Sequence, residues 1–186
     1  PADFDANPGS AHPFNGSVLH FEIHPPLTAK IKHLAARAGA TVFMVLLAAY
    51  NILLSRYTRE EDVVIGAPVA GRRHADLQHI IGMFVNMLPM RNQPKGGKTF
   101  LEFLAEIKEN TLTAFENQDY PFEDLVEQVE VNRDPSRNPL FDVMLVLQDM
   151  EQQELKIPGL TLKEYPYENN QSKFVCRQSN WAGITT

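Results

Sequence analysis

The sequence predicts a layered α/β domain with a mixed sheet, and two observations support this prediction. Segments with helical apolar spacing alternate along the chain with short β-branched or apolar runs. The 186 residues have 44% hydrophobic content, which is ample for one buried core and marginal for two. We therefore expect a single domain built from interleaved helices and strands.

The chain opens with a segment that lacks the composition of a folded unit. Residues 1–17 are rich in Asp, Asn, Pro, Gly and Ser and show no period, which predicts a linker. Residues 18–23 have the pattern of a short strand. Pro25 and Pro26 then stop this strand and open a helix, which Gly39 closes.

The next segments should form the centre of the core. Thr41 caps a second helix over residues 42–57, which is apolar nearly all the way round and should therefore pack on several sides. A β-branched run at 63–65, bounded by Gly66, predicts a strand, and a second strand is predicted at 83–90. Both strands are expected to be central in the sheet.

The third long helix has a clear start signal. Thr99 and Glu102 have the spacing of a capping box, and apolar residues follow at helical spacing as far as Phe115. A shorter helix is predicted to begin near Pro121, and residues 140–147 are typical of a fully buried strand. This order of helices and strands favours a mixed sheet.

Composition argues against several partners. The net charge is −6, and the largest basic cluster is the pair Arg72 and Arg73, so no nucleic-acid surface is predicted. The longest apolar run, 42–54, is well short of the roughly 20 residues that cross a bilayer, so no membrane partner is predicted.

A single cysteine and the lack of a leader-like start indicate the cytoplasm. The start at Pro1 indicates that the chain was cut from something longer.

Two catalytic motifs fail at specific positions. No Gly-Xaa-Ser-Xaa-Gly elbow surrounds any serine. Residues 66–71 have the glycine spacing of a phosphate loop, but Arg72 and Arg73 follow where Lys and Ser or Thr are needed, and Pro68 has no amide hydrogen to donate. A turn from strand to loop is the favoured account of these glycines.

Metal and thiol chemistry are also weakly supported. His20 and His24 have no Glu or Cys partner at ligand spacing, and His74 and His79 border a loop. Cys176 has no evident base nearby in the sequence. No metal site and no nucleophilic cysteine are predicted.

Three polar runs stand at the edges of apolar segments, where functional sites usually sit. They cover residues 81–91, 117–123 and 133–140. In the first run, strand alternation places Asn86 among apolar side chains on one sheet face. A buried amide must be hydrogen-bonded, either to a ligand or to the backbone of a neighbouring loop, and both alternatives are open.

The other two runs combine polar side chains with proline. Asp119 is predicted to cap the helix that begins at Pro121, which would be a structural role. The residues before Pro135 and Pro139 are pushed toward extended conformations, so 136–138 should form a stiff polar segment. Such a segment suits either the wall of a site or the corner of a domain.

Together these runs resemble core motifs of the C-terminal lobe of condensation domains from nonribosomal peptide synthetases. The segments that precede these runs in the chain, 41–50 and 64–72, are similar to the family as well. The resemblance runs from about Val18 to about Phe174. It implies one lobe of a chloramphenicol-acetyltransferase-like two-lobe fold. It also implies acyltransferase activity in antibiotic biosynthesis, in which an aminoacyl thioester attacks an acyl or peptidyl thioester to form an amide.

The resemblance implies that this chain holds no catalytic residue. The family's motif His-His-Xaa-Xaa-Xaa-Asp-Gly lies in the other lobe, and this sequence has no adjacent pair of His, so the fragment alone should be inactive. The implied partners are carrier domains, whose phosphopantetheine arm is the only cofactor, and the missing N-terminal lobe. The residues implied to line or brace the substrate tunnel are Asn86, Asn138, Arg137, Gln118 and Asp119. Structural roles are implied for Arg72, Arg91, Arg133 and Asp134.

One of these implied roles lacks its partner in this chain. Arg72 matches an arginine that the family is thought to pair with the Asp of the missing motif, so it should be left uncompensated here. Residues 175–186 also depart from the family pattern and hold the only Cys and the only Trp. We therefore expect a lobe over 18–174 followed by an aberrant tail at 175–186, which a frameshift after Phe174 would explain.

Two other functions are consistent with the sequence. The chain could be a stand-alone, non-catalytic module that docks carrier domains, or an unrelated α/β acyltransferase that uses one of its six His. A lobe without its partner should expose a large apolar patch, whereas an evolved binding module should not.

Overall fold

A mixed sheet with helices on one face forms the part of the chain that the structure describes. The computed structural model describes residues 19, 21–77, 79–129, 138–147 and 176–178. The helices are α1 (Pro25–Ala38), α2 (Val42–Thr58), α3 (Phe100–Glu116) and α4 (Phe122–Gln128), with a short 3-10 turn η1 (Ala75–Leu77). The strands are β1 (Val63–Val69), β2 (Asn86–Asn92), β3 (Val143–Leu145) and β4 (Cys176–Gln178).

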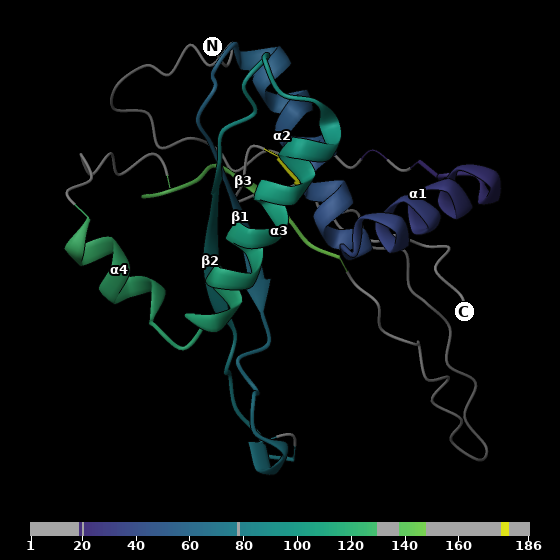
Figure 1. The fold of residues 1–186 in the computed structure, drawn as a ribbon. Coiled ribbons are helices and arrows are strands. Elements are labelled where there is room, and N and C mark those ends of the chain that lie inside the picture. Colours follow the sequence, from purple (N-terminus) through teal and green to yellow (C-terminus); the bar gives the residue numbers. More distant parts are fainter. Residues whose placement is uncertain (1–18, 20, 78, 130–137, 148–175, 179–186) are drawn as a thin grey trace, which may run out of the picture.

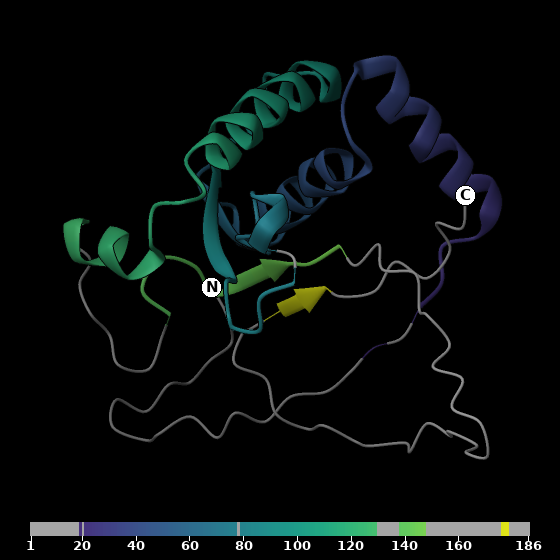
Figure 2. The ribbon, with the colours of Figure 1, turned by 90° about the horizontal axis from the view of Figure 1, so that it is seen from below.

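The sheet has the order β2-β1-β3-β4. β1 runs antiparallel to β2 and parallel to β3, and β3 runs parallel to β4. Helices α2 and α3 cover one face, α1 packs against both of them, and α4 lies beside β2 on the side away from α1 (Figures 1 and 2). The predicted α/β class with a mixed sheet is confirmed.

The three long helices begin where the sequence predicts. Thr41 caps α2, because its hydroxyl accepts a hydrogen bond of 3.2 Å from the Met44 amide. Thr99 and Glu102 form the predicted capping box of α3, in which the Glu102 carboxylate accepts from the Thr99 amide at 2.7 Å. α1 starts at Pro25 and ends just before Gly39, also as predicted.

The core lies between α2, α3 and the sheet. Its fully buried large apolar side chains come from two helices and two strands: Leu47, Ile65, Leu104, Ile107 and Leu145. α2 contributes buried residues from several sides, which confirms the packing predicted from its all-round apolar surface. Burying such side chains is the main favourable contribution to folding, at ~1.5–3 kcal/mol each.

The predicted strands differ from those observed. β2 begins at Asn86 instead of residue 83, because its pairing with β1 begins where Val69 meets Asn86. β3 covers only Val143–Leu145 of the predicted 140–147. Residues 21–24 form no strand, since a strand needs a hydrogen-bonded partner and the described part of the chain supplies none there. β1 is central as expected, whereas β2 stands at the end of the described sheet.

The glycines at 66 and 71 differ in their surroundings. A Cβ atom on Gly66 would come within 2.1 Å of the Phe141 ring, so only glycine leaves room for that ring. The sequence predicted that the strand ends at Gly66, but β1 continues through it to Val69, because Gly66 pairs with Pro89 of β2. The chain leaves the strand before Gly71, which has φ of 64° and where a Cβ atom would lie 1.8 Å from the Phe84 oxygen.

The two ends of the chain bear on the predicted boundaries. Residues 1–17, expected to be a linker, lie outside the described residues. In the segment expected to be an aberrant tail, Cys176–Gln178 form β4 and extend the sheet beyond β3. Within the described residues no single helix is both long and apolar enough to cross a membrane; α1 and α2 meet those limits only as a pair bent by 104°.

Candidate functional site

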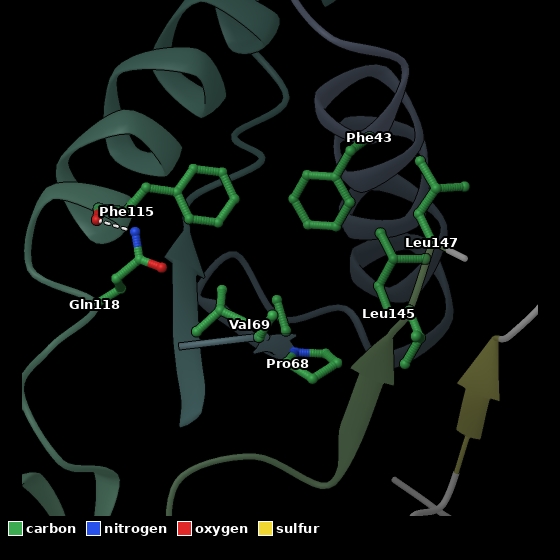
Figure 3. A pocket seen from close by; sticks show the side chains of 10 residues that line it. Phe43, Pro68, Val69, Phe115, Gln118, Leu145 and Leu147 are labelled. Carbon is green, nitrogen blue, oxygen red and sulfur yellow. Dashed lines mark hydrogen bonds between the residues drawn. The ribbon is translucent and has the colours of Figure 1, made fainter. Parts of the chain in front are cut away.

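A pocket of about 340 Å³ opens at the carboxyl ends of the parallel strands β1 and β3 (Figure 3). In α/β sheets, ligands commonly bind at this edge. The residues that line it come from both strands, from the start of α2 and from the end of α3: Phe43, Ala67, Pro68, Val69, Ala70, Phe115, Gln118, Leu145, Val146 and Leu147. Every one of these side chains except Gln118 is apolar.

Two aromatic rings and one amide shape the upper side of the pocket (Figure 3). The ring centroids of Phe43 and Phe115 are 6.5 Å apart and the rings are tilted by 39°, which is a favourable aromatic contact. The Nε2 atom of Gln118 donates a hydrogen bond of 2.7 Å to the Phe115 oxygen. That bond fixes the orientation of the amide, so its Oε1 atom points toward the space between β1 and α3.

Asn86 ties the loop before α4 to the start of β2. Its Nδ2 atom donates to the backbone oxygens of Gln118 at 2.8 Å and Tyr120 at 2.7 Å. Its Oδ1 atom accepts from the amides of Phe122 at 3.2 Å and Met87 at 2.9 Å. Of the two alternatives left open by the sequence, the structure therefore shows the tie to a neighbouring loop. Asn86 does not line the pocket itself but holds the backbone of Gln118, which does.

Asp119 belongs to the same loop but does not cap α4. The residue at the N-cap is Pro121, and no side chain makes a capping hydrogen bond there. The prediction of a cap is wrong because the Asp119 carboxylate instead accepts from Arg73 at 2.7 Å. This exposed pair is a second link between the loop and the segment that follows β1.

Arg72 organises the long connection between β1 and β2. Its guanidinium donates to the backbone oxygens of Leu77, Ile80 and Gly82, at 2.7 Å and 3.0 Å for the last two. The same group lies 4.4 Å from the centroid of the Phe84 ring, a cation–π contact. No carboxylate pairs with Arg72 among the described residues, and carbonyl groups of its own loop accept its hydrogen bonds instead.

The connection that Arg72 organises carries an exposed apolar surface. It reaches away from the helices toward η1 at the bottom of Figure 1. We call Ile80, Ile81, Met83 and Val85 the apolar arm. Ile81 is fully exposed and Met83 is 93% exposed, while the other two are about half exposed. An isolated exposed apolar residue is ordinary, but four within six positions indicate a surface made for contact.

Two further predicted residues, Arg91 and Asn138, are not among the residues that line the pocket. Arg91 donates to both carboxylate oxygens of Asp62, at 2.6 Å in the shortest contact, and this hydrogen bond holds the pKa of Asp62 below its ordinary value. Asn138 is half-buried and is not among the lining residues. Arg133, Asp134 and Arg137 fall outside the described residues.

No histidine is among the described residues that line this pocket. His74 is exposed and lies 3.3 Å from Asp76. In the ranges that the structure describes, no group of three or more His, Cys, Asp or Glu side chains is placed to hold a metal ion.

Three features of this region were not predicted from the sequence. The pocket walls, Phe43 and Phe115, were treated only as core positions. The link from Arg73 to Asp119 joins residues 46 positions apart, and no local pattern signals it. The apolar arm did have a signal, because Ile80, Ile81 and Met83 lie beside Gly82 in a run without strand alternation.

The model of the condensation domain family matches residues 4–182. The chain is 53% identical over 163 residues to bacitracin synthase 3 of Bacillus licheniformis and 52% identical over 165 residues to tyrocidine synthase 3 of Brevibacillus parabrevis. These matches cover 88% and 89% of this chain but only 3% and 2% of those synthases. The chain therefore spans a very small part of the relatives it matches.

Solved structures agree with the sequence relatives. A four-domain nonribosomal peptide synthetase bound to AMP and glycine superposes with a TM-score of 0.72 at 27% identity, over 75% of this chain and 11% of that one. The X-domain from teicoplanin biosynthesis gives 0.71 at 25% identity, over 86% and 40% of the two chains. The neighbours confirm the chloramphenicol-acetyltransferase-like fold that the resemblance implied. This chain belongs to the condensation domain family of nonribosomal peptide synthetases.

Proposed function

We propose that this chain is the C-terminal lobe of a condensation domain that joins a carrier-bound acyl or peptidyl thioester to a carrier-bound aminoacyl thioester. In this proposal the reaction takes place between two lobes, and the lobe that holds the two-histidine motif is separate from these residues. The chain alone is then inactive, because it lacks the group that would orient or deprotonate the attacking amine.

The apolar arm is the observation that best supports this proposal. Its side chains are exposed, yet Arg72 fixes the backbone beneath them through three carbonyl groups and the Phe84 ring. A preorganised apolar surface of this kind fits a permanent contact inside a larger domain, because such contacts bury apolar side chains in water-free surroundings. The small share of each relative that the chain covers is consistent with a missing lobe.

The described residues then have supporting roles. Asn86 and the pair of Arg73 with Asp119 hold the loop that carries Gln118, and this loop borders the pocket at the carboxyl edge of the sheet. Carrier domains would deliver both thioesters on phosphopantetheine arms. Positioning of this kind accelerates a reaction between two bound groups by lowering the entropy that they lose on meeting.

Amide formation in a reconstituted domain tests the proposal. The chain would be produced alone and fused to the N-terminal half of the bacitracin synthase 3 condensation domain that its match adjoins. Each sample would receive donor and acceptor carriers loaded with amino acids, and dipeptide would be measured by mass spectrometry. We expect product only from the fusion, and no product after the second His of the two-histidine motif in the added half is changed to Ala. Product from the chain alone, or none from a folded fusion, would contradict the proposal.

The same samples separate the alternative functions. A docking module would bind loaded carriers as tightly alone as in the fusion, and the fusion would form no dipeptide. An unrelated acyltransferase would form product alone, and that product would disappear when one of the chain's own His is changed to Ala. The proposed lobe predicts neither pattern.

A further inference from the structure

The pocket between α2, α3 and the sheet has the size and the lining of a site for a small apolar group. About 340 Å³ lies within the ~300–1,000 Å³ typical of small-molecule sites. Its wall of two aromatic rings and several aliphatic side chains bears no charge among the described lining residues. Such a lining disfavours the burial of an ionised group, because none of the described lining side chains carries a compensating charge.

One polar side-chain atom is available for a ligand among the described lining residues. The Nε2 atom of Gln118 is committed to the Phe115 oxygen, and Asn86 occupies the Gln118 backbone oxygen. The Oε1 atom has no hydrogen-bond partner among the described residues and points toward the pocket (Figure 3). A carbonyl oxygen can only accept, so it selects a ligand that donates an N–H or an O–H.

We propose that this pocket binds the large apolar side chain of an aminoacyl residue, with the N–H of that residue donating to Oε1 of Gln118. The side chain would pack between Phe43, Phe115 and Val69. Asn86 is then a positioning residue, because it fixes the backbone from which Gln118 extends. The identity of the ligand as an aminoacyl group rests on the proposed function, whereas its apolar character follows from the lining of the pocket.

The pantetheine arm is a weaker fit to the same space. It carries a phosphate, and none of the described lining side chains bears a charge that would compensate it. The side chain of an apolar amino acid residue instead meets a wall of apolar side chains.

Binding of small probes to the 186-residue chain tests the assignment without any catalysis. The probes are N-acetyl-leucinamide, N-acetyl-alaninamide and pantetheine, titrated while chemical shifts of methyl groups are followed by NMR. We expect N-acetyl-leucinamide to bind about tenfold or more tightly than N-acetyl-alaninamide, since each buried methylene contributes about tenfold or more. The shifts should concentrate on methyl groups of Val69, Leu145 and Leu147.

Three variants sharpen the test. Gln118→Leu removes the acceptor and should weaken N-acetyl-leucinamide binding about three- to tenfold. Val69→Phe should fill the pocket and abolish binding. Gln128→Leu, the same change on an exposed residue of α4, should leave binding as in the unmodified chain. Melting curves would establish that each variant is folded. If Gln118→Leu does not fold, binding to Val69→Phe and the selectivity between the probes still test the assignment.

Two results would overturn the assignment. Equal binding of the leucine and alanine probes would mean that the pocket does not hold an apolar side chain. Saturable binding of pantetheine with shifts at the same methyl groups would assign the pocket to the arm instead. Neither result bears on dipeptide formation by the fusion, so this assignment and the proposed function can fail separately.

Discussion

The side chain of Asn86, at the start of β2, donates a 2.8 Å hydrogen bond to the backbone oxygen of Gln118, which lies 32 positions later in the chain. Through this bond and three others, one amide fixes the loop between α3 and α4. Both Nδ2 hydrogens and the Oδ1 atom are used, so no atom of the amide is left for a substrate. Asn86 therefore acts on the pocket through Gln118.

Replacing Asn86 should loosen this loop. Asn86→Leu removes both donors and the acceptor and should lower the free energy of unfolding by about 1–3 kcal/mol, because the loop carbonyls and amides lose their partners. Asn86→Asp keeps an acceptor for the Phe122 amide but turns a carboxylate oxygen toward the Gln118 and Tyr120 oxygens, so it should also be less stable than the unmodified protein. Urea denaturation of the three proteins measures the series. Equal stability of all three would contradict the role of Asn86.

Replacing Arg72 should release the apolar arm. Lysine has no planar fork to donate to several carbonyl groups and stacks poorly on a ring, so Arg72→Lys should lose about 1–2 kcal/mol of local stability. Cleavage within the connection by thermolysin, which cuts beside apolar residues, should then be about 5- to 30-fold faster.

A matched change beside Arg72 is the control. Among the described residues Arg73 forms an exposed ion pair with Asp119 and no other, and exposed ion pairs contribute little. Arg73→Lys should therefore leave the thermolysin cleavage rate unchanged. Equal rates for both variants would show that Arg72 does not organise the arm.

A methyl group on Gly66 should disturb the contact between β1 and Phe141. Because the added Cβ atom would lie 2.1 Å from that ring, Gly66→Ala should destabilise the protein by about 1–3 kcal/mol. A Cβ atom on Gly96 meets no heavy atom within 4 Å, so Gly96→Ala should be nearly neutral. Thermal unfolding compares the two variants. A neutral Gly66→Ala variant would mean that Phe141 does not pack on β1.

The capping box of α3 should make part of the stability depend on pH. The backbone hydrogen bond from Thr99, assisted by the Thr99 hydroxyl, lowers the pKa of Glu102 in the folded protein. A carboxyl whose pKa is lowered by folding stabilises the protein above its unfolded pKa and loses that contribution as pH falls through the folded pKa. Glu102→Gln should therefore be less stable than the unmodified protein at pH 7, and the difference should shrink toward about pH 3.

Denaturation with urea across this pH range measures the effect. Glu106→Gln, on the same helix, is the comparison. In the part of the chain that the structure describes, Glu106 pairs with Lys98 alone and takes no part in the cap. A difference between Glu102→Gln and the unmodified protein that stays constant with pH would show that the charge of the carboxylate is not what the cap uses.

The elements that the sequence predicted correctly are those with local signals. Thr41, Thr99 and Gly39 mark helix ends through groups only a few residues apart, so their effects can be found along the chain. The strand ends could not be found in this way. β2 starts at Asn86 because of its register with β1, which is set by pairing across the sheet.

The sequence named residues that the structure brings together, but not how they are arranged. Asn86, Gln118 and Asp119 lie around one loop, and their part in a substrate tunnel stays a prediction. The cap by Asp119 was wrong, and the hydrogen-bond partners of Arg72 were not predicted. In both cases the partner is a group that local spacing does not reveal, namely Arg73 for Asp119 and the carbonyl groups of residues 77–82 for Arg72.

The most direct test of the central claim is the mass of the chain in solution, alone and with the N-terminal half of a related condensation domain. If the chain is one lobe, sedimentation velocity should show self-association that increases with concentration, replaced by a one-to-one complex when the other half is added. The double variant Ile81→Lys and Met83→Lys should stay monomeric and should not bind. A chain that remains monomeric at high concentration and ignores the N-terminal half would contradict the claim.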